Sequence, residues 1–381
     1  MRLITLKIQH FRNHQESYFE FGEGANILLG DNGQGKTNVL EAISYLCLTK
    51  SFYASNDLLA VAVGSDLFEV EGTFISDREK ESHVRVAYQP PTGEKLVTVN
   101  KQRIEPLSSI IGKFPIVISS PEHTPITAGG PLERRRFVDF VISQASAAYF
   151  QSLIEYRRVL KQRNKVLLDG RLYKRDIESE IAPWNDQLVL QGSSLMAKRK
   201  GFVGEFQECI VDAYRRLVLE DESPSIVYQP SVPCTADSSL GEITEEFRKQ
   251  IAREAPEEQR VGTTLIGPHR DEFLFTINNL ELRKFASQGQ HKTFLVALKI
   301  GEFYYLRERC KETPLMLLDD VFSELDEHRA RRLLEFVSSV SQTFITSTNP
   351  HYFDSKNREQ NRDRLFTIRN GSVMVNQVGA M

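Results

Sequence analysis

Short runs in which apolar and polar residues alternate dominate the first hundred positions of the chain. Period-two alternation of this kind is typical of strands that bury one face. The clearest runs cover residues 3–8, 67–75, 83–89 and 95–100, and turn signals such as Pro90-Pro91-Thr92-Gly93 separate them. Residues 26–29 form a further strand candidate that leads directly into a glycine-rich loop. The pattern predicts a strand before that loop and an antiparallel meander over residues 67–100.

Helical spacing begins directly after the glycine-rich loop. The apolar residues Val39, Leu40, Ile43, Leu46 and Cys47 recur at i, i+1, i+4, i+7 and i+8. This spacing places them in one stripe along a helix. We expect the stripe to pack against a sheet.

The pattern changes after Pro131. Apolar residues between 132 and 168 fall mostly at helical spacing, and the run ends at Gly170, a residue type favoured just after a helix. A second helical stretch covers 184–219, and the Pro- and Ser-rich residues 223–240 are less regular. After Gly262 the strand–loop–helix pattern returns, and residues 315–318 form an apolar run typical of a strand buried on both faces of a parallel sheet.

These patterns predict an α/β fold made of two lobes. Residues 1–120 and 261–381 are expected to form the first lobe, with a mixed sheet and an antiparallel β meander. Residues 121–260 are expected to form an inserted, mainly helical second lobe.

Composition narrows the class of protein. The 48 Lys and Arg against 51 Asp and Glu give a net charge of −3, which excludes a generally cationic, histone-like binder. Hydrophobic residues make up 40% and charged residues 26% of the chain, as in an ordinary globular protein. The four cysteines form no CxxC pair, which argues against a zinc site or a disulfide scaffold. The N-terminus alternates like a strand and does not predict a signal peptide, so we expect a cytoplasmic protein.

The glycine-rich loop carries the strongest chemical signal. Gly30-Asp31-Asn32-Gly33-Gln34-Gly35-Lys36-Thr37 fits the pattern G-x-x-x-x-G-K-[ST] and lies between a predicted strand and a predicted helix. In such a loop, backbone N–H groups close around phosphate oxygens. Lys36 is expected to reach the β- and γ-phosphates and Thr37 to ligate Mg²⁺, which predicts ATP and Mg²⁺ as cofactors.

A second motif supplies the carboxylates that a P-loop requires. The apolar run ends at Asp319-Asp320; we expect Asp319 to hold Mg²⁺ and Asp320 to orient the attacking water or accept its proton. Lys36 and Asp319 are 283 positions apart, so an insert divides the ATPase core between two parts of the chain. This separation disfavours Ras-like GTPases and small kinases.

A third motif lies between the other two. Ser287-Gln288-Gly289-Gln290 opens a predicted helix and could form a second anion site. The alternative interpretation is a plain helix N-cap at Ser287. Because one subunit cannot easily use two such sites on a single γ-phosphate, we interpret Ser287 as a residue that reaches ATP bound to a partner.

Together these motifs resemble the ABC-type ATPase heads of the SMC and Rad50 class, with Gly30–Thr37 as Walker A, Ser287–Gln290 as signature, Leu315–Asp320 as Walker B and Ser323–Asp326 as D-loop. Phe11-Arg12-Asn13, Gly267-Pro-His-Arg-Asp271 and Lys292 after the signature resemble the RecF family of bacterial recombination proteins more specifically.

The resemblance implies a monomer with an ABC-ATPase head that forms an ATP-dependent homodimer. It also implies binding to DNA at single-strand/double-strand junctions and cooperation with RecO and RecR mediators in loading a RecA-type recombinase. Slow hydrolysis would reset the protein. The residues it implicates in nucleotide contact, beyond the P-loop itself, are Arg12, Asn13, Asn38, Ser287, Gly289, Gln290 and Asp326, while Lys36, Asp320 and Ser287 would be catalytic.

Three positions depart from the family pattern or leave it open. The switch residue after the last core strand could be Thr348, Asn349 or His351, where ABC ATPases usually place a histidine. Tyr53 stands where an arginine is expected in many relatives. The Q-loop equivalent is sought near residues 120–122.

DNA contacts are expected from local basic patches because the mean charge is slightly negative. The insert contains three clusters of basic residues, which could equally be solvated helix faces. In the ATPase context we interpret them as a phosphate-binding track, and binding should be independent of base sequence and sensitive to salt. The assigned residues are Arg134, Arg135, Arg136, Arg157, Arg158, Lys161, Lys198, Arg199 and Lys200, with Arg163 and Lys165 in the same clusters.

Other functions remain open at this point. The energy subunit of a membrane transporter would need a groove for a membrane partner, and a scaffold that binds ATP without turnover would share the same motifs. A long-range SMC-type tether would need many coiled-coil heptads, whereas residues 132–168 span only about 55 Å as a helix. A nuclease would need an additional acidic metal-binding domain.

Overall fold

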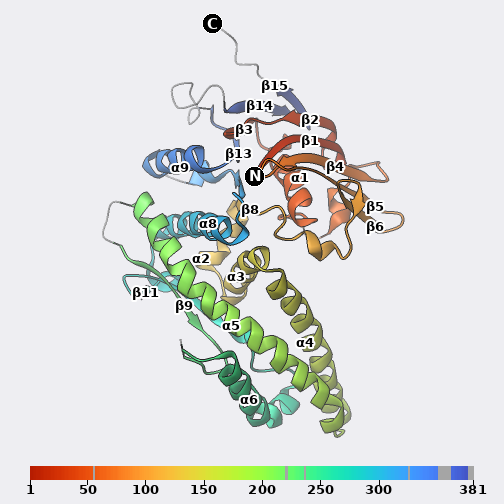
Figure 1. The fold of residues 1–381 in the computed structure, drawn as a ribbon, viewed down its shortest axis with the longest axis vertical. Coiled ribbons are helices and arrows are strands. Elements are labelled where there is room, and N and C mark those ends of the chain that lie inside the picture. The colour runs from red at the N-terminus through yellow and green to blue at the C-terminus, as the bar shows by residue number, and fades with distance from the viewer. Residues whose placement is uncertain (55, 219–221, 236, 325–326, 351–361, 376–381) are drawn as a thin grey trace. The chain divides into compact units, whose positions relative to one another are not determined.

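A computed structural model of the chain describes residues 1–54, 56–218, 222–235, 237–324, 327–350 and 362–375 (Figure 1). The chain divides into two compact units. Unit 1 contains Met1–Thr124, Asp212–Asp221 and Gln288–Met381, and unit 2 contains Pro125–Val211 and Glu222–Ser287. The predicted insert, 121–260, therefore differs from unit 2, which reaches Ser287 and gives residues 212–221 back to unit 1.

The first sheet of unit 1 is antiparallel and has the strand order β2-β1-β4-β5-β6-β7. Its strands alternate buried and more exposed residues, as the sequence pattern predicted for the meander. Phe68 on β4 pairs with Tyr88 on β5, and Val84 on β5 pairs with Val99 on β6. The strand bounds are β1 Arg2–Phe11, β2 His14–Glu20, β4 Phe68–Ile75, β5 Glu81–Gln89, β6 Glu94–Val99 and β7 Gln102–Arg103.

The second sheet of unit 1 has the order β15-β14-β3-β13-β12-β8 and is parallel except for β15. Strand β12 is buried at every position, which confirms the prediction for the apolar run before Asp319. Continuous burial follows because both faces of the sheet are covered. The strand bounds are β3 Ala25–Leu29, β8 Ile116–Ser119, β12 Leu315–Asp319, β13 Thr343–Ser347, β14 Arg364–Arg369 and β15 Ser372–Val375.

Helix α1, Lys36–Leu48, contacts both sheets of unit 1, including strands β4 and β13. All of its residues except Thr37 and Asn38 are buried. The prediction of a helix was correct, but the prediction of a single apolar stripe was too narrow because a sheet lies against each side. The other long helices of unit 1 are α8 Gln288–Cys310, which contacts β8, and α9 Glu327–Val340.

Unit 2 combines helices with a small sheet. The predicted helical run 132–168 is broken at Ser146 into α3, Pro131–Ala145, and α4, Ala147–Tyr173, and α4 packs against α3 and α6. Segment 223–240, expected to be irregular, contains strand β9. This strand pairs antiparallel with β10 and completes the order β11-β10-β9. The remaining bounds are α5 Glu178–Leu217, α6 Leu240–Val261, β9 Pro224–Gln229, β10 Glu272–Ile277 and β11 Leu280–Glu281.

Short helices connect these elements. They are α2 Pro125–Ala128 and α7 Leu282–Phe285, with 3₁₀ turns at Asp57–Ala60, Leu107–Ile110, Pro121–His123, Pro268–Arg270 and Val321–Glu324. Across the described ranges, no helix is both long enough and apolar enough to span a bilayer.

Candidate nucleotide-binding site

The P-loop joins the end of β3 to the start of α1, as predicted from the sequence. Its backbone conformation requires glycine at two points. Gly35 has a φ of 106°, and a Cβ atom there would lie 2.5 Å from Asn13 Oδ1. Gly30 has a φ of 157°, and its Cβ would lie 2.4 Å from the carbonyl oxygen of Ile368. At these two positions the neighbouring turn and strand leave no room for a side chain, whereas a Cβ atom at Gly33 would meet nothing within 4 Å.

The ammonium group of Lys36 folds back over the loop that precedes it. Its Nζ donates to the carbonyl oxygens of Gly30 at 2.7 Å and Asp31 at 2.8 Å. Burial lowers the pKa of Lys36, although the carboxylates of Asp320, Asp319 and Asp31 partly offset that effect. A cation held in this way is available to phosphate oxygens at the mouth of the loop.

The end of β12 meets the start of α1 at Asp319. Thr37 Oγ1 and Thr346 Oγ1 each donate to Asp319 Oδ1 at 2.8 Å. Burial raises the pKa of Asp319, and the neighbouring charge of Asp320 adds to that effect, against the two hydroxyl hydrogen bonds. A hydroxyl beside a buried carboxylate is an oxygen donor set that fits Mg²⁺, so Thr37 and Asp319 would hold that ion.

Asp320 follows Asp319 in a left-handed conformation, with a φ of 49°. Its backbone N–H donates to Thr346 Oγ1 at 2.9 Å. Thr346 therefore contacts both acidic residues, a role that was not predicted from the sequence. The only signal in the sequence was a threonine near the end of the apolar strand at 343–347.

Arg12 and Asn13 come from the turn between β1 and β2 and reach α1. Arg12 forms two hydrogen bonds with the carboxylate of Glu41, at 2.9 and 2.6 Å, and Glu41 is only 1% exposed. Burial lowers the pKa of Arg12, but Glu41 more than compensates and the pKa is raised overall. Asn13 Oδ1 accepts from Asn38 Nδ2 at 2.7 Å. The sequence motif thus reaches the P-loop helix, and Glu41 is a further site residue that we did not predict.

Most of these residues line one cavity of about 420 Å³ in unit 1, whereas the predicted contacts Asn13, Gly30, Asp31 and Gln34 do not line it. It brings together positions from residue 12 to residue 346, including Tyr53, Pro121 and Glu122, which the sequence analysis had noted as departures or as a Q-loop candidate. The full lining is Arg12, Asn32, Gly33, Gly35, Lys36, Thr37, Asn38, Glu41, Tyr53, Pro121, Glu122, Asp319, Asp320 and Thr346.

Two of the other predicted nucleotide contacts, Gly289 and Gln290, are not among the residues that line this cavity. Ser287 directly precedes α8, and Gly289 and Gln290 lie in its first turn, as predicted. Asp326 and His351 lie outside the described residues, as the side chain of Ser323 does. Thr348 and Asn349 are exposed just after β13.

The basic clusters divide into buried and exposed residues. Arg199, Arg134 and Arg163 are 2%, 3% and 1% exposed and form ion pairs with Asp139 and Asp271, Glu272, and Glu258 respectively. Three of the eleven basic side chains are therefore buried inside unit 2 and do not contribute to the expected surface track. Helical periodicity did not reveal this burial, because the acidic partners of Arg199 and Arg134 lie 60 to 138 positions away in the sequence.

The other basic residues are wholly or partly accessible. Arg157 is 61% exposed and lies 3.5 Å from Asp139, and Arg158 pairs with Glu155. Arg135 donates to the backbone carbonyl of Asp271, and Lys200 donates to that of Ser238. Those with exposed side chains are Arg136, Arg157, Arg158, Lys161, Lys165 and Lys198.

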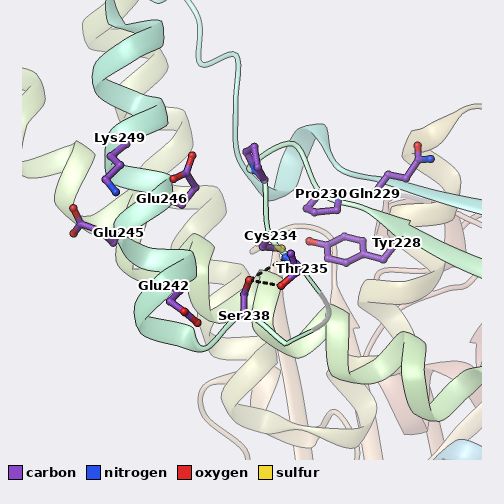
Figure 2. A pocket seen from close by; sticks show the side chains of 11 residues that line it. Tyr228, Gln229, Pro230, Cys234, Thr235, Ser238, Glu242, Glu245, Glu246 and Lys249 are labelled. Carbon is purple, nitrogen blue, oxygen red and sulfur yellow. Dashed lines mark hydrogen bonds between the residues drawn. The ribbon is translucent and has the colours of Figure 1, made fainter.

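A larger cavity, of about 950 Å³, lies within unit 2 and has different chemistry. Figure 2 shows Glu242, Glu245 and Glu246 projecting from α6 on one side, and Tyr228 on β9 and Pro230 just after it on the other. None of the predicted site residues lines it. Three carboxylates against one lysine, Lys249, disfavour a phosphate ligand, so the smaller cavity is the nucleotide site candidate.

Comparison with known proteins agrees with this geometry. Residues 2–371 match the family model described as "RecF/RecN/SMC N terminal domain". The chain is 42% identical over 378 residues to the DNA replication and repair protein RecF of Salinibacter ruber, which covers 97% of this chain and 91% of that protein.

Two solved structures extend the comparison to the fold. The recombination mediator protein RecF-ATPrS of the RecFOR pathway superposes with a TM-score of 0.90 and 30% identity, covering 99% of this chain and 98% of that one. The corresponding RecF-ATP structure gives 0.89 and 29%, with 98% and 97% coverage. The α/β ATPase-head fold is therefore confirmed, and the chain belongs to the RecF/RecN/SMC family and, within it, to the RecF proteins.

Proposed function

We propose that the chain is an ATP-dependent DNA-binding protein of replication and recombinational repair. The observation that supports this best is the hydrogen bond between Thr37 and Asp319, which joins the P-loop to the end of β12 across 282 positions of sequence. The names of the relatives support the same process, since they are DNA replication and repair and recombination mediator proteins.

Each site residue has a defined task in this proposal. The P-loop backbone and Lys36 would bind the phosphates, and Thr37 with Asp319 would hold Mg²⁺, an ion that supplies charge neutralisation at phosphate oxygens when bound. Asp320 lines the same cavity and is the candidate to orient water and accept its proton. The pair of Arg12 and Glu41 shapes the wall beside Asn38. Turnover is expected to be slow, because ATP acts as a switch.

Dimerisation would complete the nucleotide site by adding residues from a second copy of the chain. Gly289 and Gln290 do not line the cavity of their own chain, which supports the proposal that the first turn of α8, with Ser287 and Asp326, acts on nucleotide bound to a second copy. ATP would then close the homodimer, and hydrolysis would open it.

DNA contact would come from the exposed basic residues of unit 2. Arg157, Lys161 and Lys165 recur at i, i+4 and i+8 on α4, so they form one stripe with a spacing of about 6 Å. Arg136, Arg158 and Lys198 would add charge around it, whereas the buried Arg134, Arg163 and Arg199 would not. Cooperation with RecO and RecR is part of the proposal because the solved relatives belong to the RecFOR pathway.

The nucleotide part of the proposal is tested by molar mass. Light scattering after gel filtration would be measured on Asp320→Asn with Mg²⁺ and ATP, ADP or no nucleotide. We expect the mass to double with ATP only, because the variant binds ATP but cannot use Asp320 to activate water. Lys36→Ala is the matched control and should stay monomeric. A monomer under every condition, with bound ATP demonstrated, would contradict the dimer switch.

The DNA part is tested by salt dependence. Replacement of Arg157, Lys161 and Lys165 by Ala should weaken binding to gapped DNA and flatten the dependence of log K on log salt by roughly 0.7–0.9 per lost phosphate contact. Arg248→Ala with Arg253→Ala removes exposed charge from α6 and serves as control. An unchanged slope in the α4 variant would move the DNA site elsewhere.

Two alternatives give different results in these assays. The comparisons lend no support to the energy subunit of a transporter, which would also show no DNA-dependent salt slope. A scaffold that binds ATP without turnover would dimerise with ATP but release no phosphate from the unmodified protein. Phosphate release, with and without gapped DNA, separates that scaffold from the proposed switch.

A further inference from the structure

Two turns hold the P-loop from outside the nucleotide cavity, and both contact Gln34. The carbonyl oxygen of Gln34 accepts from Asn13 Nδ2 at 3.1 Å and from the backbone N–H of Gly371 at 3.0 Å. Its side-chain Oε1 accepts from the backbone N–H of Asn370 at 2.7 Å. Asn13 lies in the turn between β1 and β2, and Asn370 and Gly371 form the turn between β14 and β15.

A buried histidine links the same turns to the next peptide of the loop. His14 is 0% exposed, and its Nε2 lies 3.0 Å from the carbonyl oxygen of Gly35. A carbonyl oxygen only accepts hydrogen bonds, so Nε2 carries the proton. The other ring nitrogen lies 2.9 Å from Ser17 Oγ, and the same oxygen lies 3.1 Å from the carbonyl oxygen of Gly371. With Nε2 protonated, both of these neighbours are acceptors, and the single hydroxyl proton of Ser17 bonds to one of them at a time.

These contacts fix the orientation of two consecutive peptide groups. In a trans peptide the C=O and the following N–H point in opposite directions. Holding the carbonyl of Gln34 outward therefore turns the N–H of Gly35 toward the other side, and holding the carbonyl of Gly35 does the same for the N–H of Lys36. Phosphate binding by a P-loop depends on such inward N–H groups.

The β14–β15 turn can approach this closely because its second residue is glycine. Gly371 has a φ of 70°, and a Cβ atom would lie 2.0 Å from the carbonyl oxygen of Asn13. Gly93, in the β5–β6 turn, has nearly the same φ of 67°, but its Cβ would meet nothing within 4 Å. An alanine would meet similar backbone strain at both positions, but only at Gly371 would its Cβ atom collide with the turn that contacts the P-loop.

We propose that Asn13, His14, Ser17, Asn370 and Gly371 form a clasp that positions the P-loop for phosphate, and that the β14–β15 hairpin is thereby coupled to the nucleotide. The inference rests on the proposed function of the site as an ATP site. None of the five lines the cavity, so each is a positioning residue. Coupling is reciprocal: ATP stabilises the hairpin turn, and displacement of the turn weakens ATP binding.

The first test compares Gly371→Ala with Gly93→Ala, using binding of a fluorescent ATP analogue in Mg²⁺. We expect Gly371→Ala to bind roughly 10-fold or more weakly, and Gly93→Ala to bind like the unmodified protein. In steady-state turnover, KM should rise more than kcat falls, because the clasp orders the loop before chemistry. Equal affinities in both variants would overturn the clasp.

Ser17→Ala provides a second variant that introduces no steric clash. Ser44→Ala is its control, because that buried hydroxyl also bonds to backbone carbonyls, those of Glu41 and Lys50, without touching the clasp. Weaker nucleotide binding in Ser17→Ala alone supports the clasp, even if Gly371→Ala fails to fold. Unchanged binding in both serine variants overturns it.

Hydrogen exchange distinguishes positioning from general stability. ATP should slow amide exchange in peptides covering 364–375 in the unmodified protein, and should have no effect there in Lys36→Ala. If ATP binds and the hairpin amides do not respond, the clasp is wrong while the ATP site stands. If Lys36→Ala binds ATP normally, the proposed function itself fails.

Discussion

Replacing Arg199 by methionine tests whether this basic residue is an internal anchor or part of a DNA surface. Arg199 donates to Asp139, Tyr149, Pro268 and Asp271 at distances between 2.6 and 3.2 Å. Burial acts to lower its pKa, but Asp139, Tyr149 and Asp271 raise it well above the usual value. The side chain is therefore a permanent cation between two buried carboxylates.

Methionine has a similar length and no charge, so the substitution removes the ion pairs while filling most of the space. It leaves two buried carboxylates without their guanidinium. Breaking a buried ion pair by removing one partner costs about 3–5 kcal/mol. For a cooperative unit of about 150 residues, each kcal/mol lowers Tm by roughly 2–4 °C, so the expected decrease is roughly 6–20 °C.

The chain offers a built-in probe for this unit. Trp184 is its single tryptophan and lies on α5 within unit 2, so thermal unfolding followed by tryptophan fluorescence reports unit 2. Arg136→Met is the matched control because Arg136 is 61% exposed and pairs only with Glu133 among the contacts of its side chain that the structure describes. We expect that control to stay within about 0.5 kcal/mol of the unmodified protein.

Two results would refute this reasoning. One is a Tm for Arg199→Met that matches that of Arg136→Met, since a buried anchor cannot be removed at no cost. The other is a folded Arg199→Met variant whose DNA salt slope has become flatter, which would return Arg199 to the phosphate-binding surface as first expected from the sequence.

Three further predictions follow from the same structure. Asp319→Asn should raise the Tm of the nucleotide-free protein at pH 7–8 and abolish stabilisation by Mg²⁺–ATP; because the pKa of Asp319 is raised, the gain in Tm should shrink at acid pH. Glu41→Gln should weaken ATP binding by about 1–3 kcal/mol in titration calorimetry, because Arg12 loses its ionised partner. Burial, with Arg270, Arg135 and Arg163 nearby, lowers the pKa of His269 from 6.5 to about 4. The neutral ring makes its full contribution to the free energy of unfolding above pH 6.5, and up to about 3 kcal/mol of that free energy is lost as the pH falls toward 4. The Tm of His269→Gln should therefore depend less on pH in that window than the Tm of the unmodified protein.

Local motifs were sufficient to predict those parts of the candidate site that are built from residues adjacent in sequence. The P-loop from Gly30 to Thr37 and the strand that ends at Asp319 are each defined by residues adjacent in sequence. Their meeting could be predicted as well, because a P-loop lysine and threonine need a carboxylate for the metal. Residues that act through distant partners, such as Thr346 and Glu41, carried no such local signal.

The missed features have the same physical origin. Whether a helix face is solvated depends on what packs against it, so the pattern around Arg199 could not reveal a carboxylate 72 positions away at Asp271. Likewise, β9 lies in a Pro- and Ser-rich segment and becomes a strand only because it pairs with β10. Helix α1 is buried on all sides because two sheets enclose it. In each case tertiary contacts override the local pattern.

The two candidate sites lie in different units of the chain, and this separation predicts a measurable coupling free energy. The candidate nucleotide cavity lies in unit 1, whereas the proposed DNA stripe, Arg157, Lys161 and Lys165, lies in unit 2. If ATP controls DNA binding, some free energy must couple the two units, and that coupling acts equally in both directions. Gapped DNA should therefore tighten ATP binding by the same factor by which ATP tightens DNA binding, typically 5- to 150-fold. Titrating ATP into Asp320→Asn with and without DNA measures this factor, and equal affinities would mean that the ATPase and the DNA stripe work independently, leaving dimerisation without control over DNA.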